Sequence, residues 1–396
     1  MILRILPILL LTLILPDTYL YFRLIRGKKR SWPFRILLFL PGILMLAVAL
    51  TLALTESHAP ENLTRIIIFF NFYMLIALPK TVFMLADLAG KGISLILPGM
   101  RKFCTAVSAA ASLLLLGIMG IGILFGPSRL QVRHAEFSSP DLPQAFNGYR
   151  IVQLSDMHLT SFRSRPEMVE KIVERVMEQH PDMIVFTGDL VSSHVDELNG
   201  FEEILSRMHA PDGVYSVMGN HDYLTYARYL TPQQQAKACQ ELMDRQRSMN
   251  WDLLLNEHRI IRKGTDSIAL AGVENDGNPP FPEHGDLKKA LNGIPGYGTD
   301  TDNNSMFKIL LSHDPTHWRR KVLPQTDIQL TLSGHTHGMQ FMLFGWSPSR
   351  YFYPEWKHMY LEGTRGLYVS LGLGGALIPF RFGAWPEINV ITLHSK

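Results

Sequence analysis

The sequence predicts a chain in two parts, an all-α membrane region followed by an α/β domain with a mixed sheet or a two-sheet sandwich. Residues 1 to 127 are nearly all apolar, whereas residues 128 to 396 have the composition of an ordinary globular protein. In the second part, strand-like apolar runs first alternate with helical periods and later follow one another without long helices. We therefore expect a four-helix transmembrane region at 1–127, a proline-punctuated linker at 128–147 and an α/β domain at 148–396.

The bulk composition limits the classes of protein to consider. Of the 396 residues 18% are charged, which is below the soluble average of about 25%. The net charge of +3, with 15 histidines, is too small to indicate a nucleic-acid partner, and none is expected. The two cysteines, Cys104 and Cys239, exclude a disulfide framework and a cysteine-based zinc site. This cysteine content suits the cytosol but is also compatible with an extracytoplasmic location.

Four apolar stretches are predicted to be membrane-spanning helices, because each approaches the roughly 20 residues that cross a bilayer core. They cover residues 2–22, 34–54, 66–88 and 103–125. The first lacks a clear cleavage site and is followed by three more, so we interpret it as a retained helix and not as a signal peptide. Lys80 in the third stretch is compatible with packing against a neighbour, with snorkelling or, less readily, with an ion path.

The orientation in the membrane follows from the basic residues in the loops, which concentrate on the cytoplasmic side. The loop between the second and third stretches has only Arg65, whereas the other two loops are rich in lysine and arginine: Arg23, Arg26, Lys28, Lys29, Arg30, Arg35, Lys91, Arg101 and Lys102. The first and third loops should therefore be cytoplasmic. Both the N-terminus and the large domain are then expected outside the cytoplasm, although Arg129 and Arg133 act against this orientation.

Polar residues follow five of the predicted strands in the second part, at the point where each strand ends. The strand-like runs include "YRIVQLSDMHL", "PDMIVFTGDLV", "GVYSVMGNHD", "FKILLSHDP" and "IQLTLSGHTHG", and "LYVSLGLGG" and "EINVITLHS" follow them. Helical periods in "PEMVEKIVERVMEQH" and "FEEILSRM" separate the first three. The polar residues at the strand ends are Asp156, His158, Asp189, Asn220, His221, Asp222, His313, His335 and His337.

If these strand ends share one edge, imidazoles and carboxylates converge there, as ligands do in open α/β sheets. Carboxylates so close together would repel one another unless cations lay between them. Mixed imidazole and carboxylate ligands suit Mn, Fe or Zn, and there are too many for one tetrahedral ion. They fit two ions about 3.5–4 Å apart, the arrangement used for displacement at phosphorus. Taken singly, each residue is more often a surface or capping residue; Asp156 and Asp189, for instance, are compatible with helix caps.

The order "DMH", "GD", "GNHD", "SHD" and "GHTH" resembles the calcineurin-like metallophosphoesterase superfamily, over about residues 148 to 396. Within it, "SDMHL", "TGDLV", "GHTHG" and "PEINVITL" look like the bacterial membrane-linked or secreted branch, which includes phosphodiesterases and UDP-diacylglucosamine hydrolases. The resemblance implies a two-sheet αββα sandwich. That branch often has glycine and arginine where this chain has Met339 and Leu371, so a substrate contact is expected to differ.

Carried over residue by residue, the resemblance implies a role for each member of the motif series. Two divalent metal ions are implied, with a bridging hydroxide that attacks phosphorus. His221 would contact the phosphate and stabilise charge or protonate the leaving oxygen, and Asp222 would orient the His221 ring. Asp189 would bridge the two ions. The remaining ligands are Asp156, His158 and His337 for the first ion and Asn220, His313 and His335 for the second.

The first functional hypothesis is a membrane-bound dimetal phosphoesterase whose catalytic domain lies outside the cytoplasm. Its substrate would be a phosphomonoester or phosphodiester near the membrane, with a lipid or envelope precursor as a candidate. A UDP-lipid is less expected with this topology, because nucleotide-activated precursors are mainly cytosolic. The alternative is a non-catalytic membrane sensor or scaffold that retains the fold, against which the intact ligand set argues. A transporter is a third hypothesis, against which the sparse intramembrane charges argue.

Several further residues remain open between a functional and an ordinary role. His317 is close enough to His313 in sequence to be a weak site candidate, and Arg163 and Arg165 are compatible with a phosphate contact or with a solvated loop. An aromatic-rich region follows the last motif and is compatible with an apolar substrate groove, with insertion into the membrane interface or with ordinary packing. It comprises Trp318, Trp346, Tyr351, Phe352, Tyr353 and Trp356.

Overall fold

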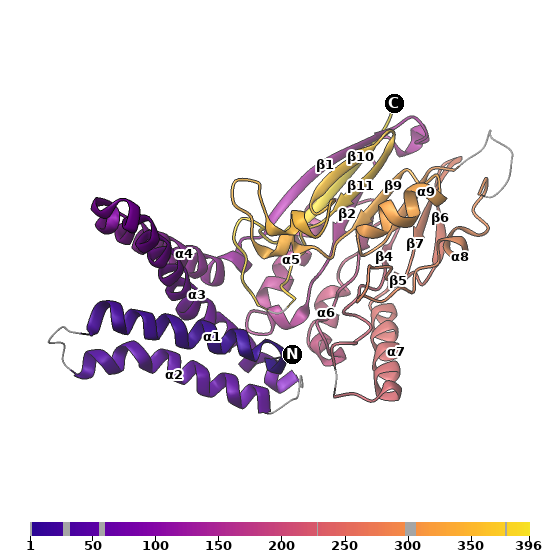
Figure 1. Cartoon of the computed structure of the whole chain (residues 1–396). Helices are drawn as coiled ribbons and strands as arrows, with labels where there is room; N and C mark the ends of the chain where they lie inside the picture. The colour runs from indigo at the N-terminus through magenta and orange to yellow at the C-terminus, as the bar shows by residue number, and fades with distance from the viewer. Residues whose placement is uncertain (1, 27–31, 55–59, 228, 298–305, 377) are drawn as a thin grey trace. The chain divides into compact units, whose positions relative to one another are not determined.

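The computed structural model describes residues 2–26, 32–54, 60–227, 229–297, 306–376 and 378–396 (Figure 1). The chain divides into two compact units, Met1–Phe125 and Gly126–Lys396. Each unit is described by itself below. The basic residues Lys28, Lys29 and Arg30, which contribute to the predicted orientation, lie outside the described residues.

The N-terminal unit consists of helices that are long and apolar enough to cross a membrane. Within the described residues there are four: α1 (Ile2–Leu20, continued by a π-helical turn at Tyr21–Ile25), α2 (Trp32–Leu54), α3 (Pro60–Ile96) and α4 (Arg101–Leu124). Helix α3 has 37 residues and extends well beyond the predicted stretch 66–88. Asp87 does not interrupt the helix, because its side chain is buried against other helices.

Two buried carboxylates of the membrane unit, Asp17 and Asp87, are paired with basic side chains from other helical segments. Lys80 Nζ lies 2.7 Å from Asp17 Oδ1, so this α1–α3 ion pair accounts for the lysine by packing against a neighbour. Asp87 is fully buried and accepts hydrogen bonds from Tyr19, Arg23, Arg101 and Thr105. Helices α1, α3 and α4 are therefore joined by buried polar contacts as well as by apolar packing.

The C-terminal unit contains two mixed sheets, each of six strands within the described residues. The first has the order β1–β12–β2–β3–β4–β5 and the second β10–β11–β9–β8–β7–β6. Their bounds are β1 Gln131–Ser139, β2 Arg150–Leu154, β3 Met183–Phe186, β4 Val214–Ser216, β5 Trp251–Leu253, β12 Glu387–Ser395, β6 Glu257–Lys263, β7 Asp266–Gly272, β8 Lys308–Leu311, β9 Leu330–Ser333, β10 His358–Glu362 and β11 Arg365–Val369. Strands β2, β3 and β4 are mutually parallel, as are β7, β8 and β9.

The two sheets pack face to face, and helices cover their outer faces. The helices are α5 (Glu167–Met177), α6 (Glu202–Leu205), α7 (Pro232–Ser248), α8 (Leu287–Leu291) and α9 (Leu323–Gln325). One apolar cluster joins Ile151, Val185, Ile309 and Leu332 between the sheets. A second packs α5–α7 on the first sheet, and a third packs α8 on the second. The predicted αββα sandwich is thus confirmed.

Two elements differ from the sequence-based expectation. The predicted linker contains β1, which pairs in parallel with β12 over Gln131–Ser139 and Glu387–Ser395, so the two ends of the unit lie side by side (Figure 1). The linker was predicted from the punctuating prolines Pro127, Pro140 and Pro143. The pairing partner of β1 lies about 250 residues away in the chain, so no local pattern reveals it. Helix α7 was not predicted, because its polar sequence presents only a weak apolar stripe.

Candidate metal centre

Three predicted ligands meet at the carboxyl ends of β2 and β9. His158 Nε2 lies 3.1 Å from His337 Nε2, and His337 Nε2 lies 3.3 Å from Asp156 Oδ1. All three side chains are buried, and one ligand atom of each lies within 4.8 Å of the others. They are therefore close enough to share one cation.

A second set meets at the carboxyl ends of β4, β8 and β9. Asn220 Oδ1 lies 3.2 Å from His313 Nε2 and 2.8 Å from His335 Nδ1. Asp189, at the end of β3, stands between the two sets. Its Oδ2 is 3.2 Å from His313 Nε2 and 3.7 Å from His158 Nε2. All seven residues predicted as metal ligands thus come together in one cluster.

The backbone around the cluster is strained, which is typical of functional sites. Asp156, His158, Asp189, His335 and His337 all have positive φ, between 44° and 72°, although none is glycine. Glycines permit the close approach of the loops that carry them. A Cβ on Gly219 would collide with the Asp189 carboxylate, and one on Gly334 with the Asp156 carboxylate. Packing of the surrounding sandwich must offset this strain.

Hydrogen bonds to the outer nitrogens of the imidazoles fix the ring orientations. His313 Nδ1 donates to the Thr187 carbonyl at 2.7 Å, which leaves Nε2 facing the cluster. Ser192 Oγ lies 3.3 Å from His158 Nδ1. The guanidinium Nη2 of buried Arg381 lies 3.1 Å from His337 Nδ1, and Arg381 is itself held by the Gly374 and Ala384 carbonyls. Such outer contacts commonly orient metal-binding histidines.

The protonation states in the cluster follow from burial and from mutual charge. Burial lowers the pKa of His158 to about 3 and also lowers the pKa values of His335 and His337, so these rings are neutral, as metal ligands must be. His313 differs, because the carboxylates of Asp189 and Asp156 outweigh burial and raise its pKa to about 10.

Within the described residues, neither the Asp156 nor the Asp189 carboxylate has a lysine or arginine at ion-pair distance. Burial raises the pKa of Asp156 to about 6, an effect that His313 opposes and Asp189 reinforces. Burial also acts to raise the pKa of Asp189, but His313 and His221 outweigh it and hold that pKa well below its usual range. Within the described residues, the partners of both carboxylates at ion-pair distance are histidines. Neutral imidazoles and buried carboxylates converging at this spacing fit divalent cations.

His221 lies at the edge of the cluster, but Asp222 does not orient its ring, so that expectation is wrong. His221 Nδ1 instead donates to the Ser192 carbonyl at 2.6 Å, and the ring stacks on Tyr226 at 4.3 Å. The Asp222 carboxylate accepts from the backbone amides of Asp189, Leu190, Val191 and Gly219. Successive residues of the turn point in different directions, so Asp222 braces the loops below the cluster. Burial, followed by Asp189, raises the pKa of Asp222 to about 7.

Three aromatic side chains from separate loops flank the second set and were not predicted as a group. Tyr353 Oη lies 2.9 Å from His335 Nε2, Phe281 meets the His335 ring edge to face, and Tyr226 Oη accepts a hydrogen bond from Asn220. Only Tyr353 belonged to the aromatic-rich region noted in the sequence. Ser192 and Arg381 were also missed, because neither belongs to a motif and both meet the histidines only through tertiary contacts.

The weaker candidates lie outside the cluster. His317 is buried, with Nδ1 2.8 Å from Ser312 Oγ and Nε2 3.7 Å from Asp276. Arg163 donates to the Asp196 carbonyl, and Arg165 donates to Ser128 Oγ. Each has a partner within the protein, so ordinary structural contacts account for all three.

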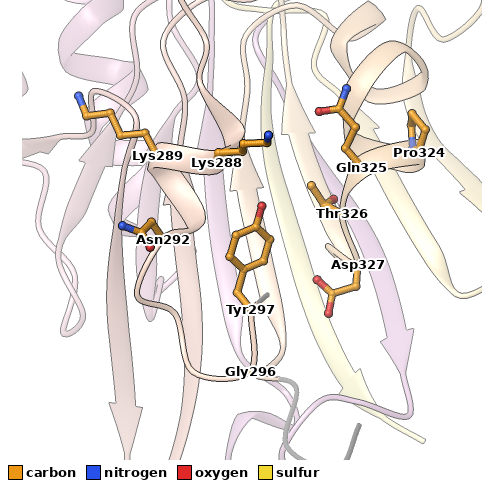
Figure 2. A pocket seen from close by; sticks show the side chains of 9 residues that line it. All are labelled: Lys288, Lys289, Asn292, Gly296, Tyr297, Pro324, Gln325, Thr326 and Asp327. Atoms are coloured by element: carbon orange, nitrogen blue, oxygen red, sulfur yellow. The ribbon is translucent and has the colours of Figure 1, made fainter. Parts of the chain in front are cut away.

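A surface cavity of about 860 Å³ lies at the other end of the second sheet (Figure 2). It is lined by Lys288, Lys289, Asn292, Gly296, Tyr297, Pro324, Gln325, Thr326 and Asp327. None of the predicted ligands is among them. The cavity is therefore separate from the cluster of predicted metal ligands.

Comparisons with known proteins agree with the motif series and the fold. A family model described as calcineurin-like phosphoesterase matches residues 149–339, and one described as probable calcineurin-like phosphoesterase, transmembrane domain, matches residues 3–127. An uncharacterized metallophosphoesterase of Bacillus subtilis, YkuE, is 30% identical over 296 residues, covering 72% of this chain and 93% of the relative.

Two further relatives extend the comparison. A zebrafish transmembrane protein with metallophosphoesterase domain is 32% identical over 272 residues, which cover 66% of this chain and only 57% of that protein. The UDP-2,3-diacylglucosamine pyrophosphatase LpxG of Chlamydia trachomatis is 29% identical over 310 residues, covering 66% of this chain and 88% of the relative. With its four apolar helices and its αββα unit, the chain belongs to the calcineurin-like metallophosphoesterases, in a form that carries a transmembrane region.

Proposed function

We propose that the chain is a membrane-bound phosphoesterase that uses two divalent metal ions, with Mn, Zn or Fe as candidates. The observation that carries the proposal is the position of Asp189. Its Oδ2 lies within 3.7 Å of a histidine from each of the two ligand sets, as a carboxylate shared by two ions requires. We assign Asp156, His158 and His337 to one ion, Asn220, His313 and His335 to the other, and Asp189 to both.

The chain's own residues would bind and orient a phosphoester at this site. When bound, two divalent ions would lower the pKa of a water between them and neutralise phosphoryl charge. His221 Nδ1 is committed to the Ser192 carbonyl, which leaves Nε2 to contact a phosphoryl oxygen or to donate a proton to the leaving oxygen. Stacking on Tyr226 holds the ring in that orientation.

The assignment of His221 is tested by replacing it. His221→Ala should lower kcat by roughly 10²–10⁴-fold while the metal content stays unchanged, because general acid catalysis contributes about that much. Turnover and metal analysis of the same preparations provide the measurement. Unchanged turnover with metals bound would contradict the role.

We further propose a lipid or envelope phosphoester as substrate and an extracytoplasmic catalytic unit. The transmembrane helices and the activity for which the chlamydial relative is named support a substrate at a membrane. The basic residues of the first and third loops support the orientation. If the catalytic unit lies outside the cytoplasm, a nucleotide-activated lipid is the less expected substrate among such phosphoesters. A reporter fused after Lys396 that behaves as cytoplasmic would reverse the orientation and restore such lipids as candidates.

The decisive experiment for the function uses the full-length protein in nanodiscs. Metal analysis should find two divalent ions per chain, and p-nitrophenyl phosphate or bis-p-nitrophenyl phosphate should turn over with added Mn or Zn. Chelation should abolish turnover and readdition should restore it. Absence of both bound metal and turnover would favour the alternative, a membrane sensor or scaffold that retains the fold.

A further inference from the structure

Exposed large apolar side chains are concentrated in one short segment of the C-terminal unit. Outside this segment, the only exposed large apolar side chains among the described residues of the unit are those of Tyr226 and Leu361. The others all lie between 339 and 352: Met339, Leu343, Phe344, Trp346, Tyr351 and Phe352. Soluble surfaces rarely gather such side chains unless they bind something apolar. We refer to residues 339–352 as the aromatic lobe.

The tip of the aromatic lobe is a strained turn that carries a fully exposed phenylalanine. Leu343 and Trp346 exchange backbone hydrogen bonds of 2.9 and 3.0 Å, with Phe344 at φ 49° and Gly345 at φ 79° between them. Asn-Gly or Gly-Gly usually occupies such a turn. The Phe344 side chain is 100% exposed. Both the left-handed backbone and the exposed ring cost free energy, and no packing of this side chain offsets them.

The aromatic lobe is held in position by the rest of the unit. Ser347 Oγ donates to the Gly338 carbonyl at 2.6 Å, and the Met342 amide donates to the Phe382 carbonyl at 2.7 Å. Lys357 Nζ donates to the Gly345 carbonyl at 3.2 Å. The apolar side chains are therefore presented outward by a fixed frame.

The charge of the aromatic lobe matches an anionic lipid surface. Residues 339–354 include Arg350 and contain no aspartate or glutamate. The Arg350 guanidinium lies 5.9 Å from the centre of the Tyr351 ring, and Lys357 Nζ lies 4.6 Å from that of Trp356. Aromatic rings combined with basic side chains are characteristic of the membrane–water interface. The helices of the N-terminal unit tether this unit to a bilayer. Lipid is therefore the most accessible partner that is apolar and can carry the opposite charge.

We propose that the aromatic lobe inserts into the headgroup region of the membrane. The lobe begins two residues after His337 and ends beside Tyr353, whose hydroxyl lies 2.9 Å from His335. An inserted lobe would therefore bring lipid headgroups to the edge of the metal cluster. This last step rests on the proposed function, whereas insertion itself does not.

Insertion is tested on the full-length protein in nanodiscs of phosphatidylcholine and phosphatidylglycerol that contain doxyl-labelled lipid. A bimane probe is attached at Phe344→Cys in a Cys104→Ala/Cys239→Ala background. The matched control is Leu361→Cys on β10, where the native side chain is 64% exposed and apolar but lies outside the lobe. Doxyl lipid should quench the probe at 344 at least about twofold more than the probe at 361. Equal quenching, or shielding of the probe at 344 from water without lipid quenching, would overturn the proposal.

A second variant separates insertion from catalysis. Phe344→Ser/Phe352→Ser changes two exposed rings and should leave hydrolysis of soluble p-nitrophenyl esters unchanged. Hydrolysis of a phosphoester lipid embedded in the same nanodiscs should fall several-fold. A parent protein that hydrolyses neither substrate would refute the proposed function while the quenching ratio still decides insertion. Normal soluble turnover without a quenching difference would refute insertion alone.

Discussion

The two units of the chain bury carboxylates in opposite ways. In the membrane unit, Asp87 accepts hydrogen bonds from two arginines, a tyrosine and a threonine, and Asp17 pairs with Lys80. In the C-terminal unit, the partners of Asp156 and Asp189 at ion-pair distance are histidines within the described residues. Two of those rings, His158 and His337, are held neutral, whereas the pKa of the third, His313, is raised to about 10.

The difference separates a structural polar cluster from one that is completed by a ligand. A buried charge is tolerated when it is paired or when it coordinates a metal. The contacts of Asp87 satisfy the first condition from within the protein. Asp189 has one charged partner of this kind, His313, whose ring must release its proton to bind a cation, so the cluster meets the second condition when cations bind. This physical contrast supports the proposed metal centre.

The largest expected effect is the loss of metal from Asp189→Asn. The shared ligand loses its charge, so we expect both ions to be lost and turnover to fall by roughly a thousandfold or more. Metal analysis and steady-state kinetics measure this. Asp244→Asn, a change to an exposed aspartate on α7, serves as the control. Retention of both ions in Asp189→Asn would remove the basis of the comparison.

A large but different effect is expected from Asp87→Asn. Loss of the carboxylate charge leaves Arg23 and Arg101 without an ionic partner, so the free energy of unfolding should fall by about 3 kcal/mol. Metal content should not change. Unfolding of the protein in detergent measures the effect against Ser94→Ala, an exposed change on α3. If Asp87→Asn altered metal content but not stability, the two clusters would not differ as described.

A smaller effect is expected from pH on metal binding. The pKa of His313 is raised to about 10 in the protein, so at neutral pH its ring must release a proton before Nε2 can bind a cation. Metal affinity should therefore rise with pH, by about tenfold per unit between pH 7 and 9. Calorimetry in buffers of different ionisation enthalpy should detect the proton released. An affinity independent of pH over that range would show that His313 is neutral before binding.

The smallest effect is expected for the coupling of Asp17 and Lys80. A double-mutant cycle with Asp17→Asn and Lys80→Met should give a coupling of about 0.6 to 1.7 kcal/mol, because ion pairs in a membrane have costly desolvation and adaptable alternatives. The free energies of unfolding of the four proteins provide the cycle. A coupling near zero would mean that the Asp17–Lys80 pair does not contribute to the association of α1 and α3.

Local patterns were sufficient for most of the fold. The apolar stretches predicted the transmembrane helices, and the runs before Asp156, Asp189 and His313 predicted β2, β3 and β8. Strand β1 was missed because its pairing with β12 joins distant parts of the chain, and α7 because its stripe is weak. In the structure, the residues of the aromatic-rich region have three different environments. Trp318 and Trp356 are packed, Trp346, Tyr351 and Phe352 are exposed, and Tyr353 contacts His335.

The sequence by itself determined the division of the chain, the strands and the types of residue at their ends, because these depend on composition and short-range periodicity. Only the tertiary structure decided how those residues meet. The His221 ring is hydrogen-bonded to the Ser192 carbonyl and not to Asp222, and Arg381 contacts His337. The apolar side chains of the aromatic lobe remain exposed. Contacts between distant segments depend on the packing of whole sheets and loops, and no local pattern encodes them.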